Sequence, residues 1–589
     1  MNSVSKIQWL PILFASAVTI VVMPSLMDPI NIPKMALLVL GAGITLGIFW
    51  KDFKNLWQQD SRPLLLISSW FAFALVLATI FSPQPLFNSV VGAWGRNNGS
   101  LTYISLLVLL LAIALQKSST PALHAIKALS ILGFGCAGYG ILQTRGLDPI
   151  SWENPGNKII LTLGNSNFAG AFMALTAIAT LVHIVKFSRT NLARTLFSIS
   201  YLTQMYFILK SDALQGLIIF LLGSGLFLGF LLSFSKLKHA KSLGIAWWFS
   251  FLVTSFIGLI SVFGIGPLAS TISPYLGSLR DRYYHWLAAI NMMKDNFIFG
   301  VGIDSFGDYY RLNRVQAAID ARGTAMTGTN NAHNTFFQIG ATGGIVLLSA
   351  YLALTIYIAF RAVRALKLHD DKVLVGALFS IWIAIQVQSF VSIDQIGLVV
   401  WGWIISGCIV SISFHVPAKN SGQKKSEKNQ RTQDSFAMGL TKVNLIVIVV
   451  GLIPSIMLTP VLVNELALRN RIVNFASSTT EEEASLRARA LVEIAQKSKQ
   501  LELRLQAVNY LLPLKQNDAA LSLTLLNNKE FPMSFESWAA TAMIYEFLGD
   551  KERAIYPRQK SVDLDPLNKE IRKLLEIDKG KTEVLFGNS

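Results

Sequence analysis

The feature of this sequence that most limits its fold is a series of long apolar runs that carry few or no charged residues. Each run has about 17 to 22 residues, and a helix needs about 20 residues to cross the hydrocarbon core of a bilayer. Runs of this length and composition indicate membrane-spanning helices. The sequence therefore predicts an all-α, polytopic membrane protein.

The composition supports this interpretation. The 589-residue chain is 52% hydrophobic and 14% charged, whereas a soluble domain usually carries about 25% charged residues. The two cysteines, Cys136 and Cys408, both lie inside apolar runs. They therefore provide neither a disulfide framework nor a metal site.

We expect about 12 to 13 spans, with twelve in a body formed by residues 1–415 and a last one at residues 443–461. The first span could be taken for a signal peptide, but no convincing small-residue cleavage site follows it, so we retain it as a helix. The predicted spans lie at about 9–27, 35–50, 63–82, 101–116, 123–143, 165–184, 195–210, 214–234, 243–266, 335–359, 373–392, 397–415 and 443–461.

The distribution of lysine and arginine predicts the orientation. If the N-terminus is cytoplasmic, the cytoplasmic loops hold most of the basic residues and the alternate short loops hold almost none, as the positive-inside rule requires. The formal net charge of +17 is then a signal of topology, and we expect no nucleic-acid partner. This orientation leaves a polar linker at residues 416–442 in the cytoplasm. It puts a large loop at about 267–334 and the tail at 463–589 outside the membrane.

The tail has a polar, charge-balanced composition and a helical pattern. One stretch has the spacing of a tetratricopeptide repeat, and a weaker copy passes through Tyr510 and Ala519, about 35 residues upstream. We therefore expect an extracytoplasmic, tetratricopeptide-like helical domain, although a generic helical hairpin remains an alternative. Such arrays offer concave surfaces for a protein partner. The residues at repeat spacing are Trp538, Tyr545, Gly549, Ala554 and Pro566.

The large outer loop contains the first candidate site residues. Ser278 and Asp281 have the spacing of a capping box, which predicts that a helix begins there. Arg280 and Arg282 lie in the first turn of that helix, where cations are mildly unfavourable unless an anion is nearby. A guanidinium group matches phosphate oxygens bidentately, so a diphosphate-linked lipid would suit both arginines. Phosphates of membrane lipids are the alternative partner.

A second polar cluster lies where the loop re-enters the membrane. His333 and Asn334 directly precede the apolar run at residues 335–359. The amide groups at a helix N-terminus favour negative charge, including that of a diphosphate. They would also lower the pKa of His333 and keep its ring neutral. A simple helix cap is the alternative interpretation.

The motifs of this region follow the pattern R-x-x-x-W-x-x-A, D-x-x-x-x-G-x-G-x-x-x-F, H-N-T-x-x-Q and G-G-I. Their order and spacing resemble those of the O-antigen ligase-related (Wzy-C) family. Two further outer segments are similar to family patterns, AWGRNNGSLTY with Arg96 and LGNSNFAGAF with Asn165 and Asn167. The loop motifs fall on Arg282, Trp286, Ala289, Asp295, Gly300, Gly302, Phe306, His333, Asn334, Thr335, Gln338, Gly343 and Gly344.

This resemblance implies transfer of a glycan from an undecaprenyl-diphosphate carrier to an acceptor hydroxyl at the outer face of the bacterial cytoplasmic membrane. It also implies a glycosyltransferase-C-like fold, an inverting reaction and no cofactor or metal. The family includes lipopolysaccharide ligases, polysaccharide polymerases and protein O-oligosaccharyltransferases. The acceptor, whether lipid, glycan or protein, therefore stays open.

The chemistry expected of such an enzyme suggests roles for the candidate residues. Arg282 would stabilise the diphosphate leaving group, and His333 would take or orient the acceptor proton, a contribution of about 10²- to 10⁴-fold. The residues expected to bind the diphosphate or the glycan are Arg280, Arg96, Lys210, Asn334, Asn165 and Asn167.

Two further observations bear on these assignments. Relatives often carry S-R-G-[AG] between spans seven and eight, where this chain has Asp212. The candidates to replace the missing arginine are Lys210, Arg96 and Arg280. Metal-dependent transferases usually need clustered carboxylates, whereas the acidic residues of the loop occur singly, so we predict no metal site. We assign Asp394, another outer carboxylate, a capping role.

Two other classes of function remain open. A transporter or flippase would place its polar residues near mid-membrane and show internal repeats. A non-catalytic scaffold that exports the tail would not need the arginine and histidine set. The nearly charge-free spans favour the transferase.

Overall fold

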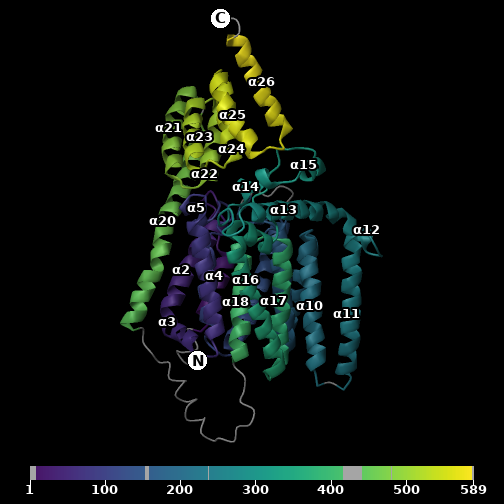
Figure 1. The fold of residues 1–589 in the computed structure, drawn as a ribbon. Helices are drawn as coiled ribbons and strands as arrows, with labels where there is room; N and C mark the ends of the chain where they lie inside the picture. Colours follow the sequence, from purple (N-terminus) through teal and green to yellow (C-terminus); the bar gives the residue numbers. More distant parts are fainter. Residues whose placement is uncertain are drawn as a thin grey trace.

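The computed structural model describes residues 8–150, 152, 158–236, 238–414, 441–478 and 480–586, and Figure 1 shows their arrangement. Within these ranges the chain forms helices joined by turns and loops, without a strand. The prediction of an all-α protein is confirmed. The predicted linker at 416–442 lies almost entirely outside the described residues.

The apolar runs form a bundle of long helices. Among the described residues, ten helices are long and apolar enough to cross a membrane. The chain is therefore a multi-pass membrane protein. The ten are α2 (Asn31–Ile48), α4 (Arg62–Ile80), α7 (Thr120–Thr144), α8 (Ser166–Lys186), α10 (Leu214–Phe234), α11 (Ala240–Val262), α16 (Thr335–Leu368), α17 (Lys372–Val391), α18 (Ile396–Phe414) and α20 (Lys442–Ala476).

The other three predicted spans are also helices, but they differ from the ten. Two of them, α1 (Leu10–Ile20) and α6 (Ser100–Ala114), are short. The third, α9 (Asn191–Lys210), has 20 residues but is less apolar. All three pack against long neighbours, α1 and α6 against α2 and α18, and α9 against α7 and α8.

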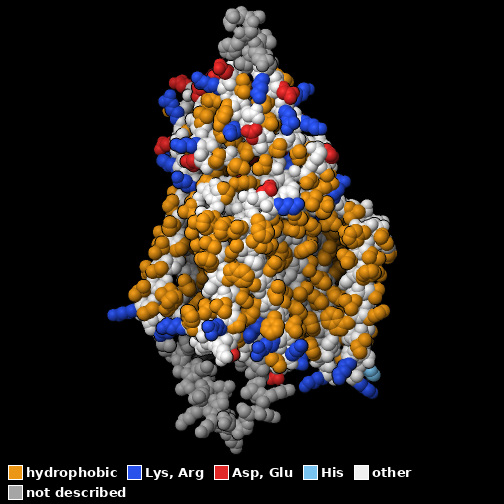
Figure 2. All heavy atoms as spheres, viewed as in Figure 1, with side chains coloured by type: hydrophobic (Ala, Val, Ile, Leu, Met, Phe, Trp, Pro, Cys, Tyr) orange, Lys and Arg blue, Asp and Glu red, His pale blue; other side chains and the backbone are white. Residues whose placement is uncertain are grey.

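The apolar helices are arranged around a central one. Nearly every side chain of α18 is buried, including Trp401, whereas α11 and α20 are mostly exposed. A helix that is hydrophobic on all sides belongs inside a bundle or within a membrane. Figure 2 shows the resulting belt of hydrophobic side chains, with lysine and arginine gathered at its lower edge. The short helix α3 (Trp50–Phe53), which carries Lys51, lies at this basic end (Figure 1).

The C-terminal residues form a separate layer of helices at the opposite end of the bundle (Figure 1). Each helix of this layer packs against the next one in sequence. Thr480 caps the first helix through the amide of Glu483, and three glutamates follow in its first turn, where the helix dipole favours them. The helices are α21 (Glu481–Lys497), α22 (Leu501–Leu511), α23 (Asn517–Glu530), α24 (Phe535–Phe547), α25 (Lys551–Leu564) and α26 (Lys569–Phe586).

One continuous helix joins the membrane bundle to this C-terminal domain. The predicted boundary at 461–463 falls inside α20, which runs without interruption to Ala476. Its last turns contribute Leu468, Ile472 and Phe475 to the core of the C-terminal domain. The domain is thus a sequential helical array, and its assignment as tetratricopeptide-like stays a prediction.

The large outer loop also contains helices. It includes α12 (Ala269–Ile272), α13 (Leu276–Asp295), α14 (Phe306–Asn313) and α15 (Gln316–Arg322), and α13 runs across the ends of the membrane helices (Figure 1). The capping box predicted at Ser278 is wrong, because α13 begins at Leu276 after Tyr275. Asp281 instead forms an ion pair with Arg322 at 3.1 Å.

The family-like glycines hold this loop against α16. Gly344 interrupts α16 with φ +68°, and a Cβ there would lie 2.1 Å from the carbonyl oxygen of Ile298. The amides of Val301 and Gly302 donate to the carbonyls of Ala341 and Thr342, each at 3.0 Å. Only a residue without a side chain permits this close approach in a left-handed conformation. The break in α16 therefore fixes where α13 and α14 lie.

Candidate functional site

A cavity of about 610 Å³ lies where the membrane helices, the outer loop and the C-terminal domain meet. We call it the outer pocket. It brings together four of the eight predicted site residues, namely Arg282, His333, Asn165 and Asn167. The remaining lining residues include Gln215, Asp308, Arg311, Thr329, Asn330, Asn331, Ser392, Leu501, Glu502, Leu505 and Glu536.

Arg282 is a half-buried cation on the pocket wall. It lies on α13, and burial lowers the pKa of its guanidinium group. An arginine stays charged at any physiological pH. Within the described part of the chain, no carboxylate forms an ion pair with Arg282. A partly desolvated charge without a partner is a costly arrangement that an anionic ligand would relieve.

His333 lies directly before α16 in a strained conformation. Its φ is +51°, which is uncommon for a residue with a side chain. Its amide donates to Oδ1 of Asn331 at 2.9 Å, and its ring stacks on that of His285, with 5.2 Å between centroids. Strain of this kind persists only where the surroundings enforce it. The backbone of His333 is thus held by Asn331, and its ring lies against that of His285 at the wall of the pocket.

Both histidines have low pKa values. Burial, followed by the nearby His285, Arg282, Arg96 and Arg322, lowers the pKa of His333 to about 3. Burial, followed by Arg322, lowers the pKa of His285 to about 4. The predicted lowering for His333 is confirmed, although burial and neighbouring cations cause it. Both rings are therefore neutral at pH 7.

Polar residues at the ends of the membrane helices line another part of the pocket. Asn165 caps α8 by accepting from the amide of Asn167 at 2.8 Å. Gln215, in the first turn of α10, donates to the carbonyl of Asn167 at 2.9 Å. Its carbonyl oxygen Oε1 is buried and has no partner among the described residues. An unsatisfied buried acceptor costs about 1 to 3 kcal/mol, so a donor group from a ligand would find a favourable partner here.

Three acidic side chains face the same pocket from two parts of the chain. Asp308 comes from α14, whereas Glu502 and Glu536 come from the C-terminal domain. Burial, followed by the charges of Glu502 and Glu536, raises the pKa of Asp308 well above its usual value. Burial also raises the pKa of Glu502 to about 7. In the described ranges no group of three or more His, Cys, Asp or Glu side chains is placed to hold a metal ion.

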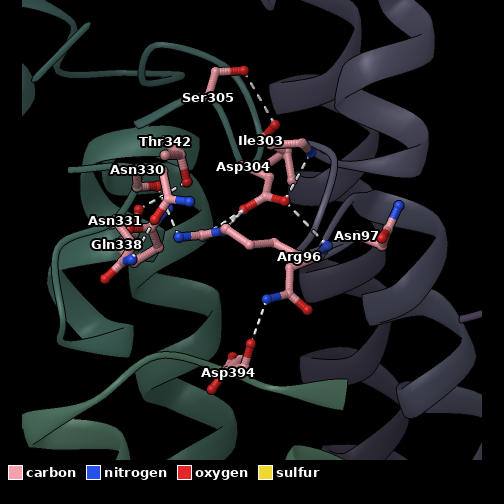
Figure 3. Close-up of polar contacts among 12 residues, drawn as sticks. Arg96, Asn97, Ile303, Asp304, Ser305, Asn330, Asn331, Gln338, Thr342 and Asp394 are labelled. Carbon is pink, nitrogen blue, oxygen red and sulfur yellow. Dashed lines mark hydrogen bonds and ion pairs between the residues drawn. The ribbon is translucent and has the colours of Figure 1, made fainter. Parts of the chain in front are cut away.

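Arg96 does not line the outer pocket, and Figure 3 shows its side chain directed toward Asp304 and Asn330. Its guanidinium group contacts Oδ1 of Asp304 at 2.5 and 3.1 Å and donates to the carbonyl of Asn330 at 2.8 Å. Asp304 also accepts from the amides of Ala93 and Asn98. Both members of the ion pair are buried. Arg96 therefore fixes the loop segment that carries His333 and is occupied by protein groups.

The other three predicted residues also lie away from the pocket lining. Asn334 is fully buried as the cap of α16, where it accepts from the amides of Phe336 and Phe337. The alternative interpretation of Asn334 as a cap thus describes its observed contacts. Arg280 and Lys210 are exposed side chains outside the lining.

Asp394 does not cap a helix in this structure. Its carboxylate accepts from the hydroxyl groups of Tyr103 at 3.0 Å and Thr335 at 2.9 Å, so it joins α6 to the start of α16. Its carbonyl accepts from the side chain of Asn98 (Figure 3). The capping role assigned to it is wrong, because Gln395 is the residue that accepts from the amide of Leu398 in the first turn of α18 (Ile396–Phe414).

Buried ion pairs fasten the C-terminal domain to the outer loop. Arg314 donates to both carboxylate oxygens of Asp565, at 2.6 and 2.7 Å, and neither side chain is more than 1% exposed. Arg311 pairs with Glu536 at 3.0 Å and lies 4.3 Å from the ring centroid of Phe535. These contacts fix the position of the C-terminal domain relative to the outer loop, and the two walls of the pocket belong to these two parts of the chain.

Reasoning from the sequence did not identify the residues that the C-terminal domain adds to the pocket. Glu502 and Glu536 lie about 170 or more residues beyond the loop, in a tail that carries no motif pointing to chemistry. Asp308 was visible as one of several single carboxylates, but only folding brings it close to Glu502. Nothing in the local pattern around any of these residues indicates the pocket.

Comparison with protein families gives one match. Residues 159–352 match the family model described as O-antigen ligase. The matched segment contains Asn165, Asn167, Gln215, Arg282 and His333 and ends before the C-terminal domain. No curated protein matches the chain.

Proposed function

We propose that this chain, which belongs to the O-antigen ligase-related family through residues 159–352, transfers a glycan from an undecaprenyl-diphosphate carrier to an acceptor hydroxyl at the outer face of the cytoplasmic membrane. The observation that carries this proposal is Arg282, a half-buried cation that lines a large pocket without a carboxylate partner. A diphosphate is the anion that best fits such a group.

Arg282 acts on the leaving group. As the bond from the sugar to the diphosphate breaks, negative charge grows on the departing phosphate oxygen. A fixed guanidinium group in a partly desolvated pocket stabilises this charge more than water would. Its planar fork also orients the diphosphate through two parallel hydrogen bonds.

His333 orients the reactants as a neutral ring. With a pKa of about 3, it carries no charge at pH 7 and does not repel or pair with neighbouring ions. A group with so low a pKa is a weak base near pH 7. We therefore assign it hydrogen bonding to the acceptor or the sugar. Asn165, Asn167 and Gln215 offer further amide groups to glycan hydroxyls.

The position of the pocket suits a substrate held in a bilayer. Its lining residues Asn165, Gln215 and Ser392 lie at the ends of α8, α10 and α17, so a polyprenyl chain could remain among the helices while its head group enters the pocket. A flippase would hold its polar site near mid-membrane. We place the pocket and the C-terminal domain on the extracytoplasmic side because the basic loops lie at the other end of the bundle.

The acceptor distinguishes the forms of this proposal. An O-antigen ligase uses a lipid acceptor, a polymerase a growing glycan, and an O-oligosaccharyltransferase a protein. The helical array of the C-terminal domain would then bind or position the acceptor or a partner protein.

Purified full-length protein would test the proposal directly. A polyprenyl-diphosphate disaccharide would serve as the donor, with an oligosaccharide, a serine-containing peptide and a lipid A-type glycolipid as acceptor probes. We expect transfer to one of the three, and we expect it to persist in excess chelator. No transfer to any probe, with the donor bound, would refute the proposed function, and turnover lost in chelator would refute a metal-independent reaction.

A further inference from the structure

The outer pocket has a second wall that the family-like segment does not provide. Leu501, Glu502 and Leu505 of α22 and Glu536 of α24 line it from the side of the C-terminal domain. All four lie beyond residue 352, where the family match ends. The cationic wall with Arg282 and the acidic wall with Glu502 thus come from different parts of the chain.

Glu502 is placed unlike an ordinary surface carboxylate. It lies in the first turn of α22, and its Oε2 atom is shielded from solvent and has no hydrogen-bond partner among the described residues. Nearby backbone amides, its own and that of Trp94, act to lower the pKa of the carboxylate, but burial outweighs them. A poorly solvated carboxylate accepts a proton more readily than one in water.

We propose that Glu502 is the general base of the transfer reaction, so that the C-terminal domain completes the active site. This inference rests on the proposed function. In the step, the acceptor O–H gives its proton to the Glu502 carboxylate while the acceptor oxygen forms a bond to the anomeric carbon. The bond from that carbon to the diphosphate oxygen breaks, and its electron pair leaves with the diphosphate held by Arg282.

The arrangement of the two walls suits displacement with inversion. The attacking oxygen and the departing oxygen then lie on opposite faces of the sugar ring, so the base and the leaving-group cation belong on opposite sides of the substrate. Arg282 on α13 and Glu502 on α22 line one cavity from the outer loop and from the C-terminal domain. The acceptor would accordingly enter along the C-terminal domain.

Other groups in the pocket are less suited to the role. His333 has a pKa of about 3 and is a weak base. Glu536 is engaged by Arg311 at 3.0 Å. Burial, followed by the charges of Glu502 and Glu536, raises the pKa of Asp308 well above its usual value, which favours the protonated form that donates a hydrogen bond. Burial, together with the charges of Asp304 and Glu536, raises the pKa of Glu502 to about 7, which is the value that best suits a base at neutral pH.

The test compares Glu502→Gln with the wild-type protein in the assay of the proposed function. We expect kcat to fall by about 10²- to 10⁴-fold, as for loss of a general base, while the affinity for the polyprenyl-diphosphate donor stays the same. Wild-type kcat should rise with pH through about 7, because Glu502 must lose its proton to act, and this dependence should disappear in the variant. Glu493→Gln, an exposed glutamate of α21 in the same domain, is the matched control and should behave as the wild type.

The outcomes separate the two proposals. If the wild-type protein transfers glycan but Glu502→Gln keeps its kcat within about threefold, or keeps the acidic limb of the pH profile, the base is another group and this inference is refuted. Loss of donor binding in Glu502→Gln would also overturn it, by assigning the residue to the donor site. Should that variant fail to fold, Glu502→Asp must retain the pH dependence at reduced kcat. Failure of the wild type with all acceptors refutes the proposed function itself.

Discussion

The buried ion pair between Arg314 and Asp565 allows a quantitative test of how the C-terminal domain is attached. The change to make is Asp565→Asn, which keeps the shape of the side chain but removes its charge. Arg314 would then be buried without an ion-pair partner, and its acceptors would be the carbonyls of Ala325 and Thr327, at 2.9 Å each, and the neutral amide oxygen left at position 565.

The expected cost follows from the burial of both groups. Removing one member of a buried pair costs about 3 to 5 kcal/mol. The carbonyls that remain around Arg314, and the contact of Arg311 with Glu536, favour the lower end of this range, about 3 kcal/mol. Because 1.4 kcal/mol corresponds to a tenfold change, the population of the undocked state should rise by about 10²-fold.

Hydrogen exchange measures this population. We expect amides in α14 (residues 306–313) and α25 (residues 551–564) to exchange about 10²-fold faster in Asp565→Asn. The exposed pair of Lys497 and Glu493 is the control. Glu493→Gln should change the free energy of opening, as measured by hydrogen exchange, by less than about 0.5 kcal/mol. The double variant Arg314→Met with Asp565→Leu should be much less destabilised than the sum of the single changes. If the single effects are small, or simply add, the pair does not hold the domain and the reasoning fails.

Three further predictions follow from other parts of the structure. Arg282→Ala should abolish glycan transfer without loss of folded protein. Arg282→Lys should retain little transfer activity, because an ammonium group lacks the bidentate fork of a guanidinium group. Turnover near the wild-type rate in Arg282→Lys would contradict a diphosphate contact. Gly344→Ala should destabilise the protein, because a Cβ there would lie 2.1 Å from the carbonyl oxygen of Ile298 and the residue has φ +68°. The control is Gly138→Ala in α7, where a Cβ would have nothing within 4 Å. This control should leave the melting temperature unchanged or raise it. A reporter that is active only in the cytoplasm should be silent when fused after Ser589; strong activity would contradict the predicted orientation.

The sequence alone determined those features that depend on local composition. Crossing a bilayer requires about 20 apolar residues in succession, so every predicted span corresponds to a helix, from α1 to α20. The three spans that fall short of the length or hydropathy expected, α1, α6 and α9, are helices nonetheless. The glycines of the loop were visible only as matches to the family pattern, and the structure gives the reason for one of them, the left-handed conformation and close backbone contact at Gly344.

Only the tertiary structure decided which charged side chains are free to act. Arg96 and Arg282 look alike in the sequence, yet Arg96 is bound by Asp304, 208 residues away, whereas Arg282 lines the pocket without a carboxylate partner. Glu502 was not recognisable for the same reason, since its proposed role depends on buried contacts that dock a distant domain over the loop. The chemistry of a carboxylate or a guanidinium group depends on burial and on neighbouring charges, and both are set by segments that meet only in the folded chain.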